Sequence, residues 1–206
     1  MQNPFVYGEV VPAGAFVDRV DELDRLVGDL AASQKVFLIS PRRYGKSSLV
    51  HRALAVMSRR GALTVEVTVS SYSSYVSFLE GYAQAFIATE TNPDRGRAWL
   101  RDGVHSTRAE VRLAPGALTV SFPNVRAERD RSRLAQEVFA LPARLAEVRR
   151  RKVVVALDEF QAIGGFNGGS VEHALRAAVQ HQRDVGYVFA GSEPSLMERM
   201  LGPKRP

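Results

Sequence analysis

The 206-residue chain has no cysteine and no long uninterrupted hydrophobic stretch. The absence of cysteine excludes disulfide scaffolds, thiol nucleophiles and cysteine zinc sites together. Nothing then argues for an oxidising compartment, so a cytoplasmic location is the default expectation. No window approaches the roughly 20 apolar residues that a membrane span requires, and residues 1–14 lack the basic and apolar regions of a signal peptide. We therefore expect a soluble protein without a membrane partner.

The sequence also lacks the residue patterns that mark two common kinds of hydrolytic enzyme. The four histidines are scattered and lack the close helical pairing of a metalloprotease site. No serine lies in a G-x-S-x-G elbow, the motif that carries the nucleophile of α/β-hydrolases. A structural metal and acyl-enzyme hydrolysis are therefore not supported.

The residues that are present indicate one globular domain with a basic surface. Hydrophobic residues make up 45% of the chain and charged residues 24%, which is enough for a sizeable core. Lysine and arginine exceed aspartate and glutamate by 28 to 22, with dense basic runs at 126–133 and 149–152. Two interpretations of these runs stay open: cations on solvated helix faces and near helix C-termini, or a surface that contacts nucleic acid.

The hydrophobic pattern alternates between buried strands and amphipathic helices, which predicts an α/β fold with a mainly parallel sheet. We expect strands at 35–39, 63–69, 152–157 and 186–191, and helices at 19–32, 45–60, 72–89, 132–151, 170–183 and 193–201. Asp18 and Ser170 are expected to cap two of these helices, and Pro142 to kink a third. Alternating apolar residues around Pro115-Gly116 predict a β-hairpin inserted at about 109–122. Residues 92–108 are polar and are left without an assignment.

The strongest motif follows the first expected strand directly. Ser40-Pro41-Arg42-Arg43-Tyr44-Gly45-Lys46-Ser47 matches the phosphate-binding loop G-x-x-x-x-G-K-[ST], except that serine replaces the first glycine. Gly45 allows the backbone to turn close to a phosphate, and Lys46 reaches the β- and γ-phosphate oxygens. The Ser47 hydroxyl is suited to Mg²⁺ and Ser48 to the α-phosphate. We therefore expect residues 40–48 to bind a nucleotide.

Two carboxylates follow the most hydrophobic of the expected strands. Asp158 and Glu159 come directly after residues 152–157, at the strand end where parallel sheets bind their ligands. Asp158 is predicted to join Ser47 in holding Mg²⁺, and Glu159 to orient the attacking water. Ser192 ends the strand at 186–191 and is a third candidate, because its side chain would face the γ-phosphate if this strand lies between the other two.

Motifs in a fixed order along the chain resemble those of the archaeal-type ATPase family, in the STAND branch of AAA+-like P-loop NTPases. The resemblance rests on Asn3-Pro-Phe5, on Phe16-Val-Asp-Arg19, on residues 40–48, on the run VVVALDEFQ at 153–161 and on Phe189-Ala-Gly-Ser192. It implies an ASCE-type three-layer fold with strand order 5-1-4-3-2. It also implies that Glu159 is the catalytic glutamate, that Ser192 is the sensor residue and that Arg19 lies near the nucleotide base and ribose.

The predicted activity is Mg²⁺-dependent hydrolysis of ATP to ADP and phosphate, with Lys46, Glu159 and Ser192 as catalytic residues. Two alternatives remain: a slow nucleotide-dependent switch, and an ATPase associated with nucleic acid or with a regulatory protein. The resemblance also makes a nucleotide-dependent oligomer an expectation. Four of five core strands are found, so the fifth strand, the lid and a winged helix are expected to be missing from residues 1–206.

Overall fold

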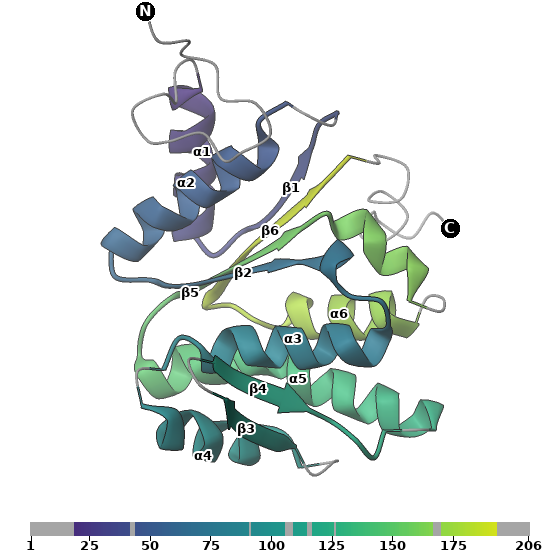
Figure 1. Ribbon diagram of the computed structural model, residues 1–206. Helices are drawn as coiled ribbons and strands as arrows, with labels where there is room; N and C mark the ends of the chain where they lie inside the picture. Colours follow the sequence, from purple (N-terminus) through teal and green to yellow (C-terminus); the bar gives the residue numbers. More distant parts are fainter. Residues whose placement is uncertain are drawn as a thin grey trace, which may run out of the picture.

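The protein is a three-layer α/β/α sandwich (Figure 1). The computed structural model describes residues 19–41, 44–90, 92–105, 109–114, 117–125, 127–166 and 170–192. The central layer is a sheet of four parallel strands in the order β1-β6-β5-β2. These strands are β1 (Lys35–Ile39), β2 (Leu63–Thr68), β5 (Val153–Asp158) and β6 (Val185–Gly191). If these four strands are numbered by their order in the chain, their order across the sheet is 1-4-3-2. This agrees with the order 5-1-4-3-2 that the resemblance implies, for the four strands predicted from the sequence.

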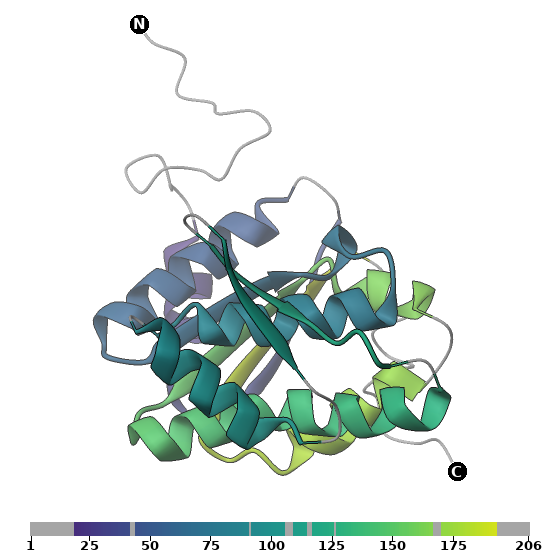
Figure 2. The ribbon, with the colours of Figure 1, turned by 60° about the horizontal axis from the view of Figure 1, so that its bottom comes forward.

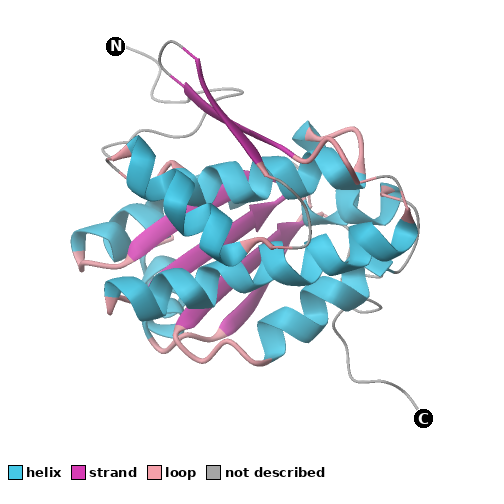
Figure 3. Ribbon diagram, turned by 90° about the horizontal axis from the view of Figure 1, so that it is seen from below, coloured by secondary structure: helices cyan, strands magenta, loops and turns pink. Residues whose placement is uncertain are grey.

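Helices cover both faces of the sheet. On one face lie α1 (Val20–Ala31) and α2 (Lys46–Arg59), and on the other lie α3 (Tyr75–Ile87), α5 (Glu128–Arg149) and α6 (Ser170–Gln180) (Figure 1). Figure 3 shows the strands behind the second helix layer. Two short 3₁₀ helices, η2 (Val69–Ser71) and η3 (Phe160–Gly165), follow the carboxyl ends of β2 and β5.

The two central strands are hydrophobic throughout because they are buried on both faces. Every residue of β5 and β6 is buried. Side chains alternate along a strand, so Val155 and Leu157 join the core beneath α3 and α5, whereas Val154 and Ala156 join the core beneath α1 and α2. The apolar run that marks β5 in the sequence is therefore shared between two hydrophobic cores.

An antiparallel hairpin lies outside the main sheet, as the sequence predicts. Its strands are β3 (Glu110–Ala114) and β4 (Ala117–Ser121), and the expected Pro-Gly turn between them lies outside the described residues. The hairpin crosses over α3 (Figure 2), where Val120 and Phe122 are buried in the larger core. The Phe122 backbone N–H also donates to Glu80 Oε1 of α3 at 2.7 Å.

The segment that the sequence left unassigned forms α4 (Pro93–Gly103). The Asn92 side chain caps it, since its Oδ1 accepts from the N–H groups of Asp94 and Arg95. Leu100 is fully buried, and Trp99 packs partly buried against the same core. The helix is mostly polar because a narrow stripe of its surface packs against the core and most of the rest is exposed.

Several expected helix ends differ from the observed ones. Arg19 takes the N-cap position of α1 without a side-chain cap, and Asp18 lies outside the described residues. Helix α5 begins at Glu128, earlier than expected, and contains Pro142 within its span. Ser170 is the first helical residue of α6 rather than a residue before it. The helix expected at 193–201 is outside the described part of the chain.

The basic run 149–152 is largely engaged within the protein. Arg149 forms a two-pronged ion pair with Glu90, whose side chain is mostly buried. Arg151 Nε donates to the Gly61 carbonyl at 2.7 Å, and Lys152 Nζ donates to the Ala31 carbonyl at the end of α1. The structure thus favours the interpretation of this run as cations near helix ends.

No helix in the described part of the chain is long and apolar enough to cross a membrane.

Candidate active site

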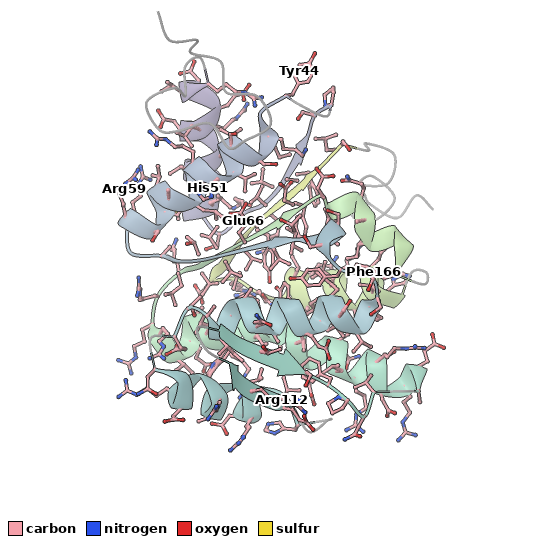
Figure 4. The ribbon with its side chains drawn as sticks, viewed as in Figure 1. Tyr44, His51, Arg59, Glu66, Arg112 and Phe166 are labelled. Atoms are coloured by element: carbon pink, nitrogen blue, oxygen red, sulfur yellow. The ribbon has the colours of Figure 1, made fainter. Side chains whose placement is uncertain are left out.

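The phosphate loop joins the end of β1 to the start of α2. Gly45 occupies the N-cap of α2 in the left-handed conformation, with φ +69°, and Lys46 is the first helical residue. Gly45 carries no side chain that could cap this helix, so the start of α2 offers backbone amide groups to an anion. Pro41 and Tyr44 are exposed, and Tyr44 points outward beyond the end of β1 (Figure 4). Arg42 and Arg43 lie outside the described residues.

Ser47 and Asp158 meet although 111 positions separate them. Ser47 Oγ donates to Asp158 Oδ2 at 2.6 Å, and the other Asp158 oxygen accepts from the Glu159 backbone N–H at 2.9 Å. The carboxylate is 6% exposed. A hydroxyl and a carboxylate oxygen at contact distance are ligands that Mg²⁺ accepts, with phosphate oxygens and waters completing its octahedron. The residues present therefore fit the metal that the motif implies.

Lys46 and Glu159 face each other beside this pair. Lys46 Nζ lies 3.8 Å from Glu159 Oε1, and the Lys46 side chain is 6% exposed while that of Glu159 is 31% exposed. Glu159 has a left-handed backbone, with φ +50°, which is uncommon for a residue with a side chain. Such outliers concentrate at functional sites, where the surrounding structure holds them in place. The chain thus turns sharply at the residue predicted to orient water.

A fifth side chain, Gln161, belongs to the site although the motifs assign it no role. Its Nε2 donates to Glu159 Oε2 at 2.5 Å, and its Oε1 accepts from the Ser192 backbone N–H at 3.3 Å. Gln161 is the last letter of the run that marks β5 and the carboxylates. Its position two residues after Glu159 is the feature of the sequence from which its place in the site could have been predicted.

Ser192 and Ser40 lie at the ends of neighbouring strands. Strand β6 lies between β1 and β5, so the expected placement of Ser192 between the phosphate loop and the carboxylates is correct. The Ser40 N–H donates to the Gly191 carbonyl at 3.3 Å, continuing the β1–β6 ladder. Ser40 Oγ is buried and has no hydrogen-bond partner among the described residues. The Ser40 hydroxyl is thus unpaired among the described residues, at the position where the phosphate-binding motif has its first glycine.

Arg19 reaches the phosphate loop from the start of α1. Its Nη1 donates to the Tyr44 carbonyl at 2.8 Å, and its Nε pairs with Glu22 at 2.7 Å. A Cβ atom built on Gly45 would lie 3.7 Å from Arg19 Nη1. The structure therefore brings Arg19 beside the loop and holds its guanidinium there through two partners. Ser48 is buried in the first turn of α2.

The geometry of this site agrees with the family that the sequence matches. A family model described as an ATPase domain predominantly from Archaea matches residues 16–205. The chain belongs to this family. Because the family and the fold agree, the archaeal-type ATPase assignment and the P-loop α/β fold made from the motifs are confirmed, and the chain is a P-loop ATPase domain at the family level. No curated protein matches the sequence.

Solved structures of similar fold are more distant in sequence. The Walker-type ATPase PABY2304 of Pyrococcus abyssi is 16% identical with a TM-score of 0.59, and the match covers 96% of this chain and 51% of that one. The Aeropyrum pernix ORC1 protein in complex with DNA is 16% identical with a TM-score of 0.55, over 90% of this chain and 41% of that one. The Aeropyrum pernix ORC2 protein is 13% identical with a TM-score of 0.54, over 97% of this chain and 47% of that one. The ATPase domain thus spans about half the length of these structures.

Proposed function

We propose that this domain hydrolyses ATP to ADP and phosphate with Mg²⁺, and that turnover drives a conformational switch. The observation that carries the proposal is the meeting of Ser47 with Asp158 and of Lys46 with Glu159 at the carboxyl edge of the sheet. These four residues come from two sequence segments that only the fold brings together. They have the chemical types that phosphoryl transfer requires.

Each residue has a role that follows from its position. Lys46 and the uncapped amides of α2 bind the β- and γ-phosphate oxygens and stabilise the charge that builds up there. Ser47 and Asp158 would hold Mg²⁺, which when bound supplies further neutralisation of the phosphates. Glu159 orients the attacking water in line with the bond that breaks. Ser192, at the end of β6, would sense the γ-phosphate, and Arg19 would lie near the base and ribose.

Two substitutions test the proposal. Lys46→Ala removes the buried cation from the phosphate site, so we expect at least a tenfold loss of ATP affinity in a direct binding measurement.

Glu159→Gln keeps the shape of the side chain and its exposure but removes the base, so ATP binding should persist while phosphate release falls by at least 100-fold. Glu172→Gln on α6 is the matched control and should leave both quantities unchanged. Normal ATP affinity in the Lys46→Ala variant would contradict the site assignment.

Single-turnover kinetics separate hydrolysis from the slow-switch alternative. Wild-type protein in excess over ATP should release phosphate within minutes if turnover is the output. Bound nucleotide without phosphate release over hours would instead favour a switch that is read by binding alone. The run at 149–152 is a weak candidate for a nucleic-acid surface, because three of its four residues already bind groups within the protein.

A further inference from the structure

The side chain of Gln161 joins two strands of the sheet through one amide group. Gln161 belongs to the first turn of η3, directly after β5. Its Nε2 donates to Glu159 Oε2 at 2.5 Å, and its Oε1 accepts from the N–H of Ser192 at 3.3 Å. The end of β5 and the end of β6 are thus connected at the place where the nucleotide is proposed to bind.

The charges around the amide determine which way it faces. A glutamine amide can be turned over without changing its shape, so its orientation follows from its partners. The opposite orientation would set Oε1 against the Glu159 carboxylate and the NH₂ group against the Ser192 N–H, so both contacts would be repulsive. Only the observed orientation satisfies both neighbours.

The two oxygens of Glu159 have different surroundings. Oε2 accepts from Gln161, whereas Oε1 faces Lys46 across 3.8 Å. A phosphate bound at the loop would draw the Lys46 ammonium to itself, which leaves Oε1 free to accept a hydrogen bond from water. The carboxylate is only partly buried, so without Oε2 held it would rotate among several positions.

We propose that Gln161 is a positioning residue that anchors Glu159 by Oε2, so that Oε1 is the oxygen that orients the attacking water. Through the Ser192 N–H, the same amide ties the position of Glu159 to the end of β6. This inference rests on the proposed hydrolytic function. It adds that the orientation of the glutamate and the position of the sensor strand change together.

Two substitutions at Gln161 separate the two halves of the link. Gln161→Leu keeps a similar size and removes both hydrogen bonds. Gln161→Glu keeps an oxygen that can accept from the Ser192 N–H, but it removes the donor and places a like charge beside Glu159. Gln136→Leu makes the same chemical change at an exposed position of α5 and serves as the control. Thermal melting of each variant checks that the fold is kept.

Three quantities are measured: the affinity for ATP with Mg²⁺, the single-turnover rate of phosphate release, and hydrogen exchange at the Ser192 amide without nucleotide. Both Gln161 variants should bind ATP within about threefold of wild type and release phosphate about 10- to 100-fold more slowly. Exchange at the Ser192 amide should accelerate at least fivefold in Gln161→Leu and stay near the wild-type rate in Gln161→Glu. The control should match wild type throughout.

The failures of the two proposals are distinguishable. If wild-type protein binds ATP but releases no phosphate, the hydrolytic function is wrong. If wild-type protein turns over and Gln161→Leu turns over equally fast, the positioning role is wrong while hydrolysis stands. An unchanged Ser192 exchange rate in Gln161→Leu would overturn the tie to β6, whatever the turnover.

Discussion

At the scale of single residues, the contact between Ser47 and Asp158 shows how the fold joins two distant sequence segments at the site. The Ser47 hydroxyl donates to a buried carboxylate, and a second Asp158 oxygen is held by a backbone N–H. Hydrogen bonds of this kind satisfy a charge that would otherwise be costly to bury. The Ser47 hydroxyl and the Asp158 carboxylate would hold a divalent cation here, which would supply positive charge to the phosphates.

Asp158→Asn should therefore weaken the response to Mg²⁺ more than it weakens the fold. The amide keeps the shape of the carboxylate, since its oxygen can accept from the Glu159 N–H while its NH₂ group donates to the Ser47 hydroxyl, but it lacks the charge that attracts the ion. We expect the Mg²⁺ concentration for half-maximal phosphate release to rise at least tenfold, as measured by titration at saturating ATP. Asp24→Asn, at an exposed position of α1, should leave it unchanged. An unaltered Mg²⁺ response in Asp158→Asn would remove Asp158 from the metal site.

Local sequence predicts the residues of the site that sit in motifs, but not their partners. Lys46, Ser47 and Asp158 follow from a strand-loop-helix pattern and from the rule that ligands bind at the carboxyl edge of a parallel sheet. The two hydrogen bonds of Gln161 depend on the distance between the ends of β5 and β6, which no local pattern contains. The bond from Arg19 to the Tyr44 carbonyl likewise requires α1 to pack beside the loop.

At the scale of elements, burial decides which predictions succeed. All four strands of the sheet were predicted, and β5 and β6 most directly, because continuous apolar runs of this length suit strands covered on both faces. The hairpin was predicted because its residues alternate around a turn dipeptide. Helix α4 was missed because it is polar overall and contributes few large apolar side chains to the core, Trp99 and Leu100 among the described residues. Its start was nevertheless marked by Asn92-Pro93, a cap followed by proline at the first helical position.

The contact between β6 and α1 gives an element-scale prediction. A Cβ atom at Gly186 would meet the Leu30 carbonyl oxygen at 2.9 Å, and backbone cannot move aside as a side chain does. Gly186→Ala should therefore lower the free energy of unfolding by about 1–3 kcal/mol in a denaturant titration. Gly28 lies on the exposed face of the same helix α1, with nothing within 4 Å of its Cβ position. Gly28→Ala should raise stability by about 0.5–1 kcal/mol, because alanine favours a helix interior. Equal effects of the two substitutions would contradict the close approach.

At the scale of the whole molecule, the proposed nucleotide site lies at the edge of the sheet that separates the two hydrophobic cores. Helix α2 packs on one core through its buried face, and η3 packs on the other through Phe160 and Ile163. The site takes Lys46 and Ser47 from the first of these elements, and Glu159 and Gln161 flank the start of the second. A ligand held by both would therefore link the layers on opposite faces of the sheet.

Binding of ATP with Mg²⁺ should consequently stabilise the whole domain. A ligand that binds only the folded state at 100 times its dissociation constant adds about 2.7 kcal/mol, and each kcal/mol raises the melting temperature of a domain of this size by about 2–4 °C. We expect an upward shift of about 5–10 °C in a thermal scan. At the same nucleotide concentration, the tenfold or greater loss of affinity in Lys46→Ala should reduce the shift to about half of the wild-type value or less. Gly186→Ala should melt lower and still shift by an amount similar to wild type, because its defect lies away from the loop. A wild-type melting temperature that does not respond to nucleotide would mean that these residues do not form a nucleotide site in the folded protein.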